Sequence, residues 1–333
     1  MKNGIQDIVR FAVDCKTDAM RWNLPDELQD EYPWGFIEKT SSWIEQYAKN
    51  TDGVEKVTEI DIGNHVQSMY IAFHWCQFKK IYTMNGTFTR YLAETEDAPI
   101  SVNVIRRLPF RSFALMFDEE EKIIDLFPQV FKCVDCIFAT IGIEAETDVY
   151  ISMAVVGKSE KGNRIVASGV TSLKDGDCYE TALRDGDKIL YTGSLEETRM
   201  EWRPMYRLVL NACQYFCASN AEVRDVKISK SKKPKVMVNG KEKPVSVNVS
   251  EVGFRLGRRF ESMYAEKKEQ EQRGDSTEWK PRRPHVRRAH WHHYWTGPGR
   301  TVLELRWLEP VFVMGDSEKI DAVAHKVGGE LTG

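Results

Sequence analysis

The chain has 333 residues, a formal net charge of −3, and 42% hydrophobic, 29% charged and 11% aromatic residues. This composition is typical of a packed globular protein and excludes disordered, collagen-like and small disulfide-bonded chains. The sequence contains no apolar run long enough for a membrane helix, and Asp7, Arg10 and Asp14 interrupt its beginning, where a signal peptide is apolar. We therefore expect a cytoplasmic protein of about two domains that does not contact a membrane.

Charge is distributed unevenly along the sequence. Residues 221–307 contain 21 Lys and Arg against 11 Asp and Glu, which gives this segment a charge of +10 and leaves −13 for the rest of the chain. A basic segment on an acidic protein raises the local potential and the rate at which an anion associates. The distribution predicts a polyanionic or acidic partner at this segment and does not indicate the fold.

Residues 1–105 are predicted to form a mainly helical N-terminal part. Apolar residues recur with the period of an amphipathic helix in two stretches, from Ile5 to Trp22 and from Val66 to Cys76. Asn85-Gly86 then indicates a turn or the end of a helix.

Residues 106–222 are predicted to form an antiparallel sheet closed by a helix. Runs rich in Val, Ile, Phe and Tyr alternate with turn residues, and the expected strands lie near residues 110–117, 129–143, 148–156 and 164–170. Ser194 and Glu197 match a capping box, and the apolar residues from Met205 to Cys217 keep helical spacing. A helix is therefore expected after the sheet.

The composition changes again after this helix. Residues 223–250 carry two prolines and Asn239-Gly240 among many lysines, and they are predicted to form a basic hairpin or linker on the surface. Residues 251–314 are expected to form a C-terminal module, and residues 315–333 a flexible tail.

Within the C-terminal module, the stretch from Phe254 to Gln272 is typical of a charged helix, and Thr301 to Val313 of one or two strands. The predicted elements indicate an α+β fold with a helical N-terminal part, a central antiparallel sheet and a C-terminal module made of a helix and a hairpin.

Two cysteine pairs have spacings that occur at zinc sites. Cys133 with Cys136, and Cys213 with Cys217, could supply four thiolates. Both pairs lie among apolar residues, however, where buried thiols are usually inert. The seven cysteines are an odd number without regular spacing, which favours a reducing compartment. We therefore expect free thiols packed in the core, and no bound metal or other cofactor.

The most unusual segment spans residues 281–307. It reads PRRPHVRRAHWHHYWTGPGRTVLELRW and contains four of the seven histidines, three of the nine tryptophans and six arginines. Gly297-Pro298-Gly299 is a turn signal, so the segment is predicted to form a hairpin that places Arg306 and Trp307 beside the His and Arg side chains. If its first arm is extended, successive side chains alternate between a polar face with His290, His292 and Tyr294 and an aromatic face with Trp291, His293 and Trp295.

Four interpretations compete for this segment. Its Trp and Arg side chains could stack in an internal network, bind phosphates and unpaired bases of RNA, or line a peptide-binding groove. In the fourth, histidines act as general base and acid on an RNA phosphodiester without a metal, and the candidates are His285, His290 and His292. A metal site is disfavoured, because no Asp or Glu lies between Lys280 and Arg300. The candidate binding residues are Arg282, Arg283, His285, Arg287, Arg288, His290, Trp291, His292, Tyr294, Trp295, Arg300, Arg306 and Trp307.

The string RRPHVRRAHWHHYWTGPG, followed by RW and PVFV, resembles the C-terminal signature of a large type V-A anti-CRISPR family of phages and other bacterial mobile elements. The resemblance covers Arg282 to Val313, and the preceding GFRLGRRF stretch is similar more weakly. It implies a protein that recognises the nascent N-terminal polypeptide of the effector nuclease and causes loss of its mRNA during translation. It implies no catalytic residue, and His293 occupies a variable position of the motif.

The resemblance also implies the partners. They are the N-terminal segment of the type V-A effector nuclease as a nascent peptide, together with a ribosome, an mRNA or a host nuclease, in the cytoplasm of the bacterial host and without a membrane or DNA partner. Two weak contacts on one ribosome–message assembly would raise the effective concentration of each. We expect a binding module more than an enzyme, and the residues leave open which nuclease cuts the message. The alternatives are a metal-independent ribonuclease using histidines of the motif and a single-stranded RNA-binding protein of mobile elements.

Overall fold

A mixed sheet forms the centre of the protein. The computed structural model describes residues 2–21, 59–96, 98–144, 147–178, 195–238, 240–272 and 285–313. The strands of the sheet are β1 (Lys80–Met84), β2 (Ser112–Phe117), β3 (Cys133–Glu144), β4 (Asp148–Lys158), β5 (Arg164–Lys174), β6 (Val223–Val226) and β9 (Asn248–Val252). Their order is β5-β4-β3-β2-β1-β9-β6. Strands β2 to β5 pair antiparallel, as does β6 with β9, while β1 is parallel to both of its neighbours.

Both faces of this sheet are buried. Side chains alternate along each strand, so Phe113 and Leu115 of β2 belong to one apolar cluster while Ala114 and Met116 belong to another. Every residue of β1 and β2 is buried, and β2 reads as a nearly continuous apolar run, as a strand covered on both faces does. Such a sheet needs a covering layer on each side, and helices supply both.

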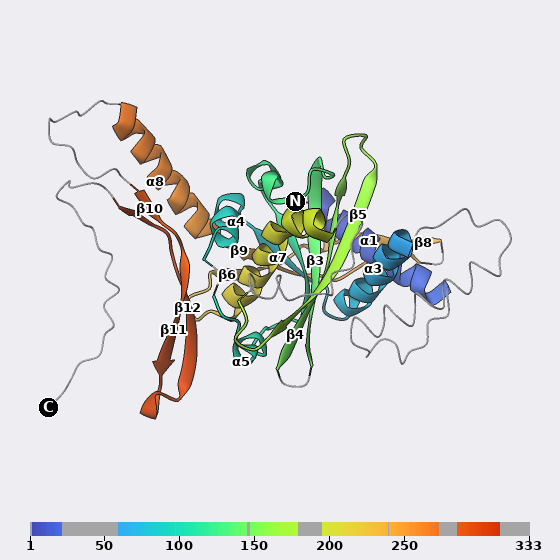
Figure 1. The fold of residues 1–333 in the computed structure, drawn as a ribbon. Helices are drawn as coiled ribbons and strands as arrows, with labels where there is room; N and C mark the ends of the chain where they lie inside the picture. Colours follow the sequence, from blue (N-terminus) through green and yellow to red (C-terminus); the bar gives the residue numbers. More distant parts are fainter. Residues whose placement is uncertain are drawn as a thin grey trace.

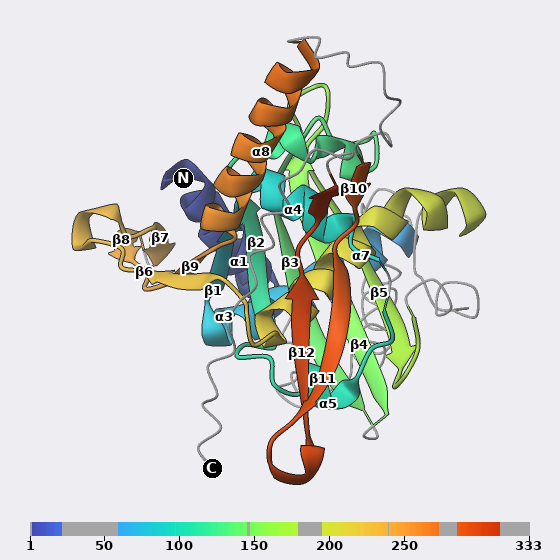
Figure 2. The same cartoon turned by 90° about the vertical axis from the view of Figure 1, so that its left-hand side faces the viewer.

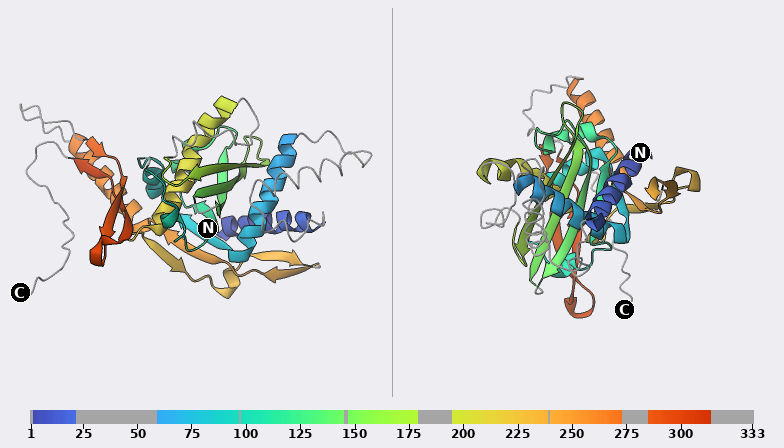
Figure 3. Two further views of the ribbon diagram at one scale, coloured as in Figure 1. Left: turned by 60° about the horizontal axis from the view of Figure 1, so that its bottom comes forward. Right: turned by 90° about the vertical axis from the view of Figure 1, so that its right-hand side faces the viewer.

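Helices α1 (Lys2–Arg21) and α3 (Glu59–Phe78) cover one face, as the right-hand view of Figure 3 shows. The Trp75 ring of α3 meets the Phe138 ring of β3 edge-on at 5.6 Å, and the Trp75 indole N–H donates to the carbonyl oxygen of Lys80 at 2.9 Å. The predicted helical periodicity of both segments is confirmed.

Helices α4 (Gly86–Ala93), α5 (Val102–Ile105) and α7 (Leu195–Cys217) cover the other face (Figure 1). Helix α4 begins at Asn85, whose side-chain oxygen accepts a hydrogen bond from the backbone N–H of Phe88 at 3.0 Å. The expectation that Asn85-Gly86 makes a turn or ends a helix is therefore wrong, because Asn85 caps the start of one. The predicted helix after the sheet is confirmed in α7, while Ser194 of the capping box lies outside the described residues.

The C-terminal elements form a further layer outside α4 and α7. They are α8 (Phe254–Gln272), β10 (His285–Arg287), β11 (His290–Thr296), β12 (Val302–Leu308) and β13 (Val311–Val313). Strand β11 pairs with β12, and β10 pairs with β13. The β11–β12 hairpin lies across the helical layer on the side away from the sheet, and Figure 2 shows it from the front. The charged helix and the late strands that the sequence predicts are confirmed.

A second hairpin, β7 (Lys235–Val238) with β8 (Lys241–Pro244), projects from the β6 side of the molecule (Figures 2 and 3). The Gln6 amide of α1 holds it, because Nε2 donates to the carbonyl oxygen of Lys235 at 2.6 Å and Oε1 accepts from its N–H at 2.8 Å. The sequence predicted a basic hairpin or a linker for residues 223–250, and within this range β7 and β8 form a hairpin with exposed lysines.

The α+β fold is confirmed, with two differences. The sheet is mixed and not purely antiparallel, because β1 lies parallel between β2 and β9. Strand β1 also comes from the part expected to be mainly helical, β6 comes from the expected basic hairpin or linker, and β9 begins in that segment and ends at Val252, in the expected C-terminal module. One sheet therefore crosses the expected boundaries at residues 105 and 222. The expected tail, residues 315–333, lies outside the described residues.

The cysteines considered for zinc lie on opposite faces of the sheet. Cys136 packs in the apolar cluster between the sheet and helices α1 and α3, whereas Cys213 belongs to α7 and packs in the cluster on the other face. The two pairs therefore cannot form one site. Burial raises the pKa of both thiols well above the ordinary value, and raises that of Cys217 to about 12. Among the described residues, no group of three or more His, Cys, Asp or Glu could hold a metal ion, and no helix is long and apolar enough to cross a membrane.

Candidate functional site

The candidate site is the β11–β12 hairpin. Its strands pair so that His292 lies opposite Arg306 and Thr296 lies opposite Val302. Gly297 and Gly299 in the connecting turn have φ angles of 79° and 72°, a conformation that glycine adopts without steric cost. The predicted hairpin and its Gly-Pro-Gly turn are confirmed.

The inner face of the hairpin is part of the core. Trp291 and Trp307 lie opposite each other, and only 7% and 1% of their surfaces are exposed. The Trp291 indole N–H donates to Oδ1 of Asn211 in α7, and the Trp307 indole N–H donates to Oγ1 of Thr95, both at 3.0 Å. Contrary to the expected partner contact, these two tryptophans are structural, because strand alternation turns them toward the helices and their donors are satisfied within the chain.

Further hydrogen bonds fix the hairpin to the helical layer. The Asn220 amide pairs with both backbone groups of Trp307, since Nδ2 donates to the carbonyl oxygen at 2.8 Å and Oδ1 accepts from the N–H at 3.1 Å. On the other side, the backbone N–H of Glu96 donates to the carbonyl oxygen of Ala289. Both strands are held, so the hairpin is a firm support for the side chains that face away from the core.

The outer face of the hairpin, defined by His290, His292, Tyr294, Glu304 and Arg306, presents stacked polar and aromatic groups. The His292 and Tyr294 rings lie 4.2 Å apart, and the Arg306 guanidinium carbon lies 5.3 Å from the centre of the Tyr294 ring. Nε and Nη2 of Arg306 donate to Oε1 of Glu304 at 3.0 and 2.9 Å. Hydrogen bonds from the side chains of Ser219 and Arg306 hold the pKa of Glu304 below its ordinary value. The predicted position of Arg306 beside the histidines is confirmed.

Exposed arginines flank the outer face. Arg287, Arg288 and Arg300 are exposed, and their side chains make no hydrogen bond or ion pair with another described residue. A guanidinium group presents several donors in a planar fork, which suits carboxylates, carbonyl groups and phosphates. These three arginines are therefore available to an external partner.

The free end of the hairpin is apolar and exposed. Trp295 and Val302 are 60% and 50% exposed. Trp295 lies on the same face of β11 as Trp291, which is buried. The hairpin extends beyond the helices at this end, so alternation no longer implies burial. An exposed Trp on a rigid support is typical of a contact residue, and we call Trp295 and Val302 the apolar tip.

The remaining candidates differ in position. His290 is exposed at the start of β11, and His285 begins β10, which pairs with β13. Arg282 and Arg283 lie outside the described residues. His293 is half-buried on the inner face, where burial and the neighbouring His292 lower its pKa.

Sequence reasoning missed the residues that hold the hairpin. Thr95, Asn211 and Asn220 are distant from residues 281–307, and none belongs to a recognisable motif. One signal was available, because Asn211 lies between Leu210 and Ala212 in an apolar stripe. A buried amide in such a stripe needs a hydrogen-bond partner from elsewhere in the fold.

Comparison with known proteins decides the family. The model of the AcrVA2-like family, described as the anti-CRISPR type V subtype A2 family, matches residues 82–315. The chain belongs to the AcrVA2-like family. This match extends well beyond the residues that carried the C-terminal resemblance, and it includes all of the sheet strands except part of β1. The expected family is confirmed, and the protein is an anti-CRISPR that inhibits type V-A CRISPR.

A solved structure supports the AcrVA2-like fold. The crystal structure of AcrVA2 is similar with a TM-score of 0.51 at 16% sequence identity, over 94% of this chain and 97% of that one. At this identity the likeness shows a shared fold and leaves individual residue roles open. No curated protein matches the chain.

Proposed function

We propose that this AcrVA2-like protein lowers production of the type V-A effector nuclease by recognising its nascent N-terminal polypeptide, and that this leads to loss of the effector mRNA during translation. The outer face and the apolar tip of the β11–β12 hairpin form the recognition surface. Family membership supports the target system, since the matched residues 82–315 contain the whole hairpin.

One observation carries the assignment of this surface. The same two strands hold Trp291 and Trp307 in the core and expose Tyr294, Trp295 and Arg306, which are side chains of the types that dominate binding hot spots. A surface anchored in this way loses little conformational entropy on binding. In the described part of the chain β11 pairs only with β12, so an extended peptide can add as a strand at its other edge.

Recoding the target gene tests whether the peptide is read. The protein is co-expressed with an effector gene whose N-terminal codons are synonymously changed, and with a gene whose frameshifted start encodes a different peptide from nearly the same nucleotides. We expect the fall in effector mRNA and protein to survive recoding and to disappear after the frameshift. The reverse pattern would show that RNA sequence is recognised.

Substitutions on the hairpin test where the peptide binds. Tyr294→Ala combined with Arg306→Ala should weaken binding of a synthetic N-terminal effector peptide by about tenfold or more and abolish silencing. Arg164→Ala is the matched control, because Arg164 is an exposed arginine at the start of β5. Equal binding by the double variant and the control would place the peptide site elsewhere.

A second candidate function is RNA cleavage by the protein itself, favoured by His292 lying directly opposite Arg306. A histidine beside a guanidinium could transfer a proton while the cation stabilises the phosphorane charge. Purified protein would then cut effector mRNA in the presence of a chelator, and His290→Ala or His292→Ala would stop it. If the purified protein leaves the mRNA intact, cleavage by the protein itself is excluded and the protein acts as a binding module.

A further inference from the structure

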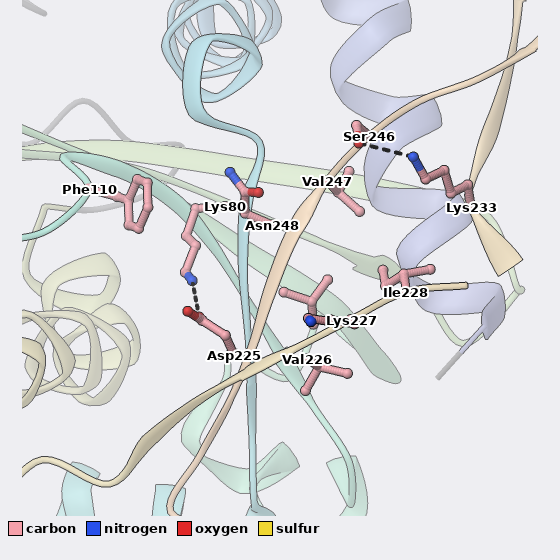
Figure 4. A pocket seen from close by; sticks show the side chains of 11 residues that line it. Lys80, Phe110, Asp225, Val226, Lys227, Ile228, Lys233, Ser246, Val247 and Asn248 are labelled. Atoms are coloured by element: carbon pink, nitrogen blue, oxygen red, sulfur yellow. Dashed lines mark hydrogen bonds and ion pairs between the residues drawn. The ribbon is translucent and has the colours of Figure 1, made fainter. Parts of the chain in front are cut away.

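A pocket of about 570 Å³ lies beside β6 and β9, where the chain leaves β6 toward β7 (Figure 4). None of its described lining residues belongs to the β11–β12 hairpin. The volume is within the range of small-molecule sites. The polar side chains of the lining are Lys80, Asp225, Lys227, Lys233, Ser246 and Asn248.

Lys80 places a positive charge at the inner wall of this pocket. Its side chain is only 5% exposed, and Nζ donates to Oγ of Ser250 and to Oδ1 of Asp225, the latter at 3.3 Å. The same ammonium lies 4.8 and 4.9 Å from the centres of the Tyr82 and Phe110 rings. A buried ammonium is costly without a counter-charge, and Asp225 is the one carboxylate among the described lining residues.

The other two lysines are not balanced by this carboxylate. Lys227 makes no hydrogen bond or ion pair with any residue that the structure describes, and Nζ of Lys233 donates to Oγ of Ser246 at 3.3 Å. Three ammonium groups and one carboxylate leave the lining with two excess positive charges. Figure 4 shows that these groups come from separate segments of the pocket lining, with Lys80 turned toward Asp225 and Lys233 turned toward Ser246.

The size of the excess indicates the ligand. A phosphate monoester carries a charge of about −1.5 to −2 at pH 7, which matches two positive charges. A carboxylate or a single phosphodiester carries one negative charge and would leave one ammonium unbalanced. Lysine ammonium groups bind phosphate as point charges and adapt their position through flexible stems.

We propose that this pocket binds a phosphate monoester, as carried by a free nucleotide or by the 5′ end of an RNA chain. Lys227 and Lys233 contact the phosphate oxygens, and Lys80 supplies a fixed positive charge behind them. The Asp225 carboxylate repels the ligand, because it lines the same pocket, although its side chain is 88% exposed. The site is separate from the hairpin and is independent of the peptide recognition proposed above.

Calorimetric titration of the full chain tests the ligand class. The probes are a short oligouridylate with a 5′-phosphate, the same oligonucleotide with a 5′-hydroxyl, and adenosine monophosphate. We expect the 5′-phosphorylated RNA to bind about tenfold or more tightly than the 5′-hydroxyl form. Adenosine monophosphate binding as tightly as the RNA would identify a free nucleotide as the ligand, and weaker binding would identify the RNA end. Equal affinity for the two RNAs, or no binding of any probe, would overturn the proposal.

A pair of double variants tests the location. Lys227→Gln with Lys233→Gln should weaken binding of the 5′-phosphorylated probe by about tenfold or more. Lys241→Gln with Lys243→Gln is the matched control, because it removes the same charge from exposed lysines of β8 that do not line the pocket. Equal losses in both variants would show general surface attraction and overturn the site. Asp225→Asn should tighten binding, and weaker binding by this variant would contradict the charge balance.

Discussion

Trp291 of β11 donates its indole hydrogen bond to Asn211 of α7 at 3.0 Å. The same Asn211 side chain donates through Nδ2 to the carbonyl oxygen of Leu92 in α4 at 2.8 Å. One buried amide therefore joins the hairpin to two helices. Because a buried polar group is costly to leave without a partner, the hairpin and the helical layer should unfold together.

Substitution of Trp291 tests this coupling. Trp291→Phe keeps an aromatic ring but leaves Oδ1 of Asn211 unpaired, and should lower the free energy of unfolding by about 1–3 kcal/mol. Trp291→Ala also removes the whole buried indole ring and should cost about 3–5 kcal/mol. Urea unfolding followed by circular dichroism measures both.

Trp295→Ala is the control for these variants, because Trp295 is on the same strand and is 60% exposed. Its free energy of unfolding should stay within about 0.5 kcal/mol of the wild type. A stable Trp291→Ala variant would contradict the structural role of the inner face.

Gly257→Ala tests the contact between α8 and the start of α4. A Cβ at Gly257 would lie 1.7 Å from Oδ1 of Asn85, the oxygen that caps α4. The methyl group must displace this cap, and we expect a loss of about 2 kcal/mol or more in urea unfolding. Gly142→Ala should change stability by less than about 1 kcal/mol, because its nearest neighbour is Cβ of Tyr150 at 3.7 Å. Equal stability of the two variants would show that α8 can move away freely.

Glu261 should make stability depend on pH. Hydrogen bonds from Lys122 and Thr87 lower the pKa of this α8 carboxyl below its ordinary value of 4.5. The carboxylate therefore stabilises the fold above the unfolded pKa, and the contribution is lost as the pH falls through the lower folded pKa. Glu261→Gln should lower the urea midpoint at pH 7 and differ less from the wild type at about pH 3. The same difference at both pH values would refute this linkage.

The buried thiols should be unreactive in the native protein. Cys136 and Cys213 are almost fully buried, and burial raises the pKa of both thiols. Because the thiolate is the reactive form, a thiol reagent should label these two residues only after unfolding, as peptide mapping would show. Dialysis against a chelator should leave the melting temperature unchanged. Rapid native labelling of either cysteine, or zinc retained at a fixed ratio, would contradict core packing.

Local patterns predicted most helices and the antiparallel strands. The α8 helix and strands β2 to β5 have apolar spacings that are visible within short windows of sequence, since periodicity is a local property. The sequence did not predict strand β1, because Lys80–Met84 follows a helix almost directly and begins with a charged residue. Its state as a strand depends on pairing with β2 and β9, which are distant in the chain.

The sequence by itself determined the family and the hairpin. Both depend on contiguous residues, namely an uncommon string of side chains and a Gly-Pro-Gly turn between two extended arms. Only the tertiary structure decided that Trp291 and Trp307 face inward while Tyr294 and Trp295 are exposed. Alternation along a strand separates two faces but does not say which one the body covers, and that depends on α4 and α7. The charge of the β6–β9 pocket could not be predicted from the sequence either, because Lys80 and Asp225 come together only when distant strands join one sheet.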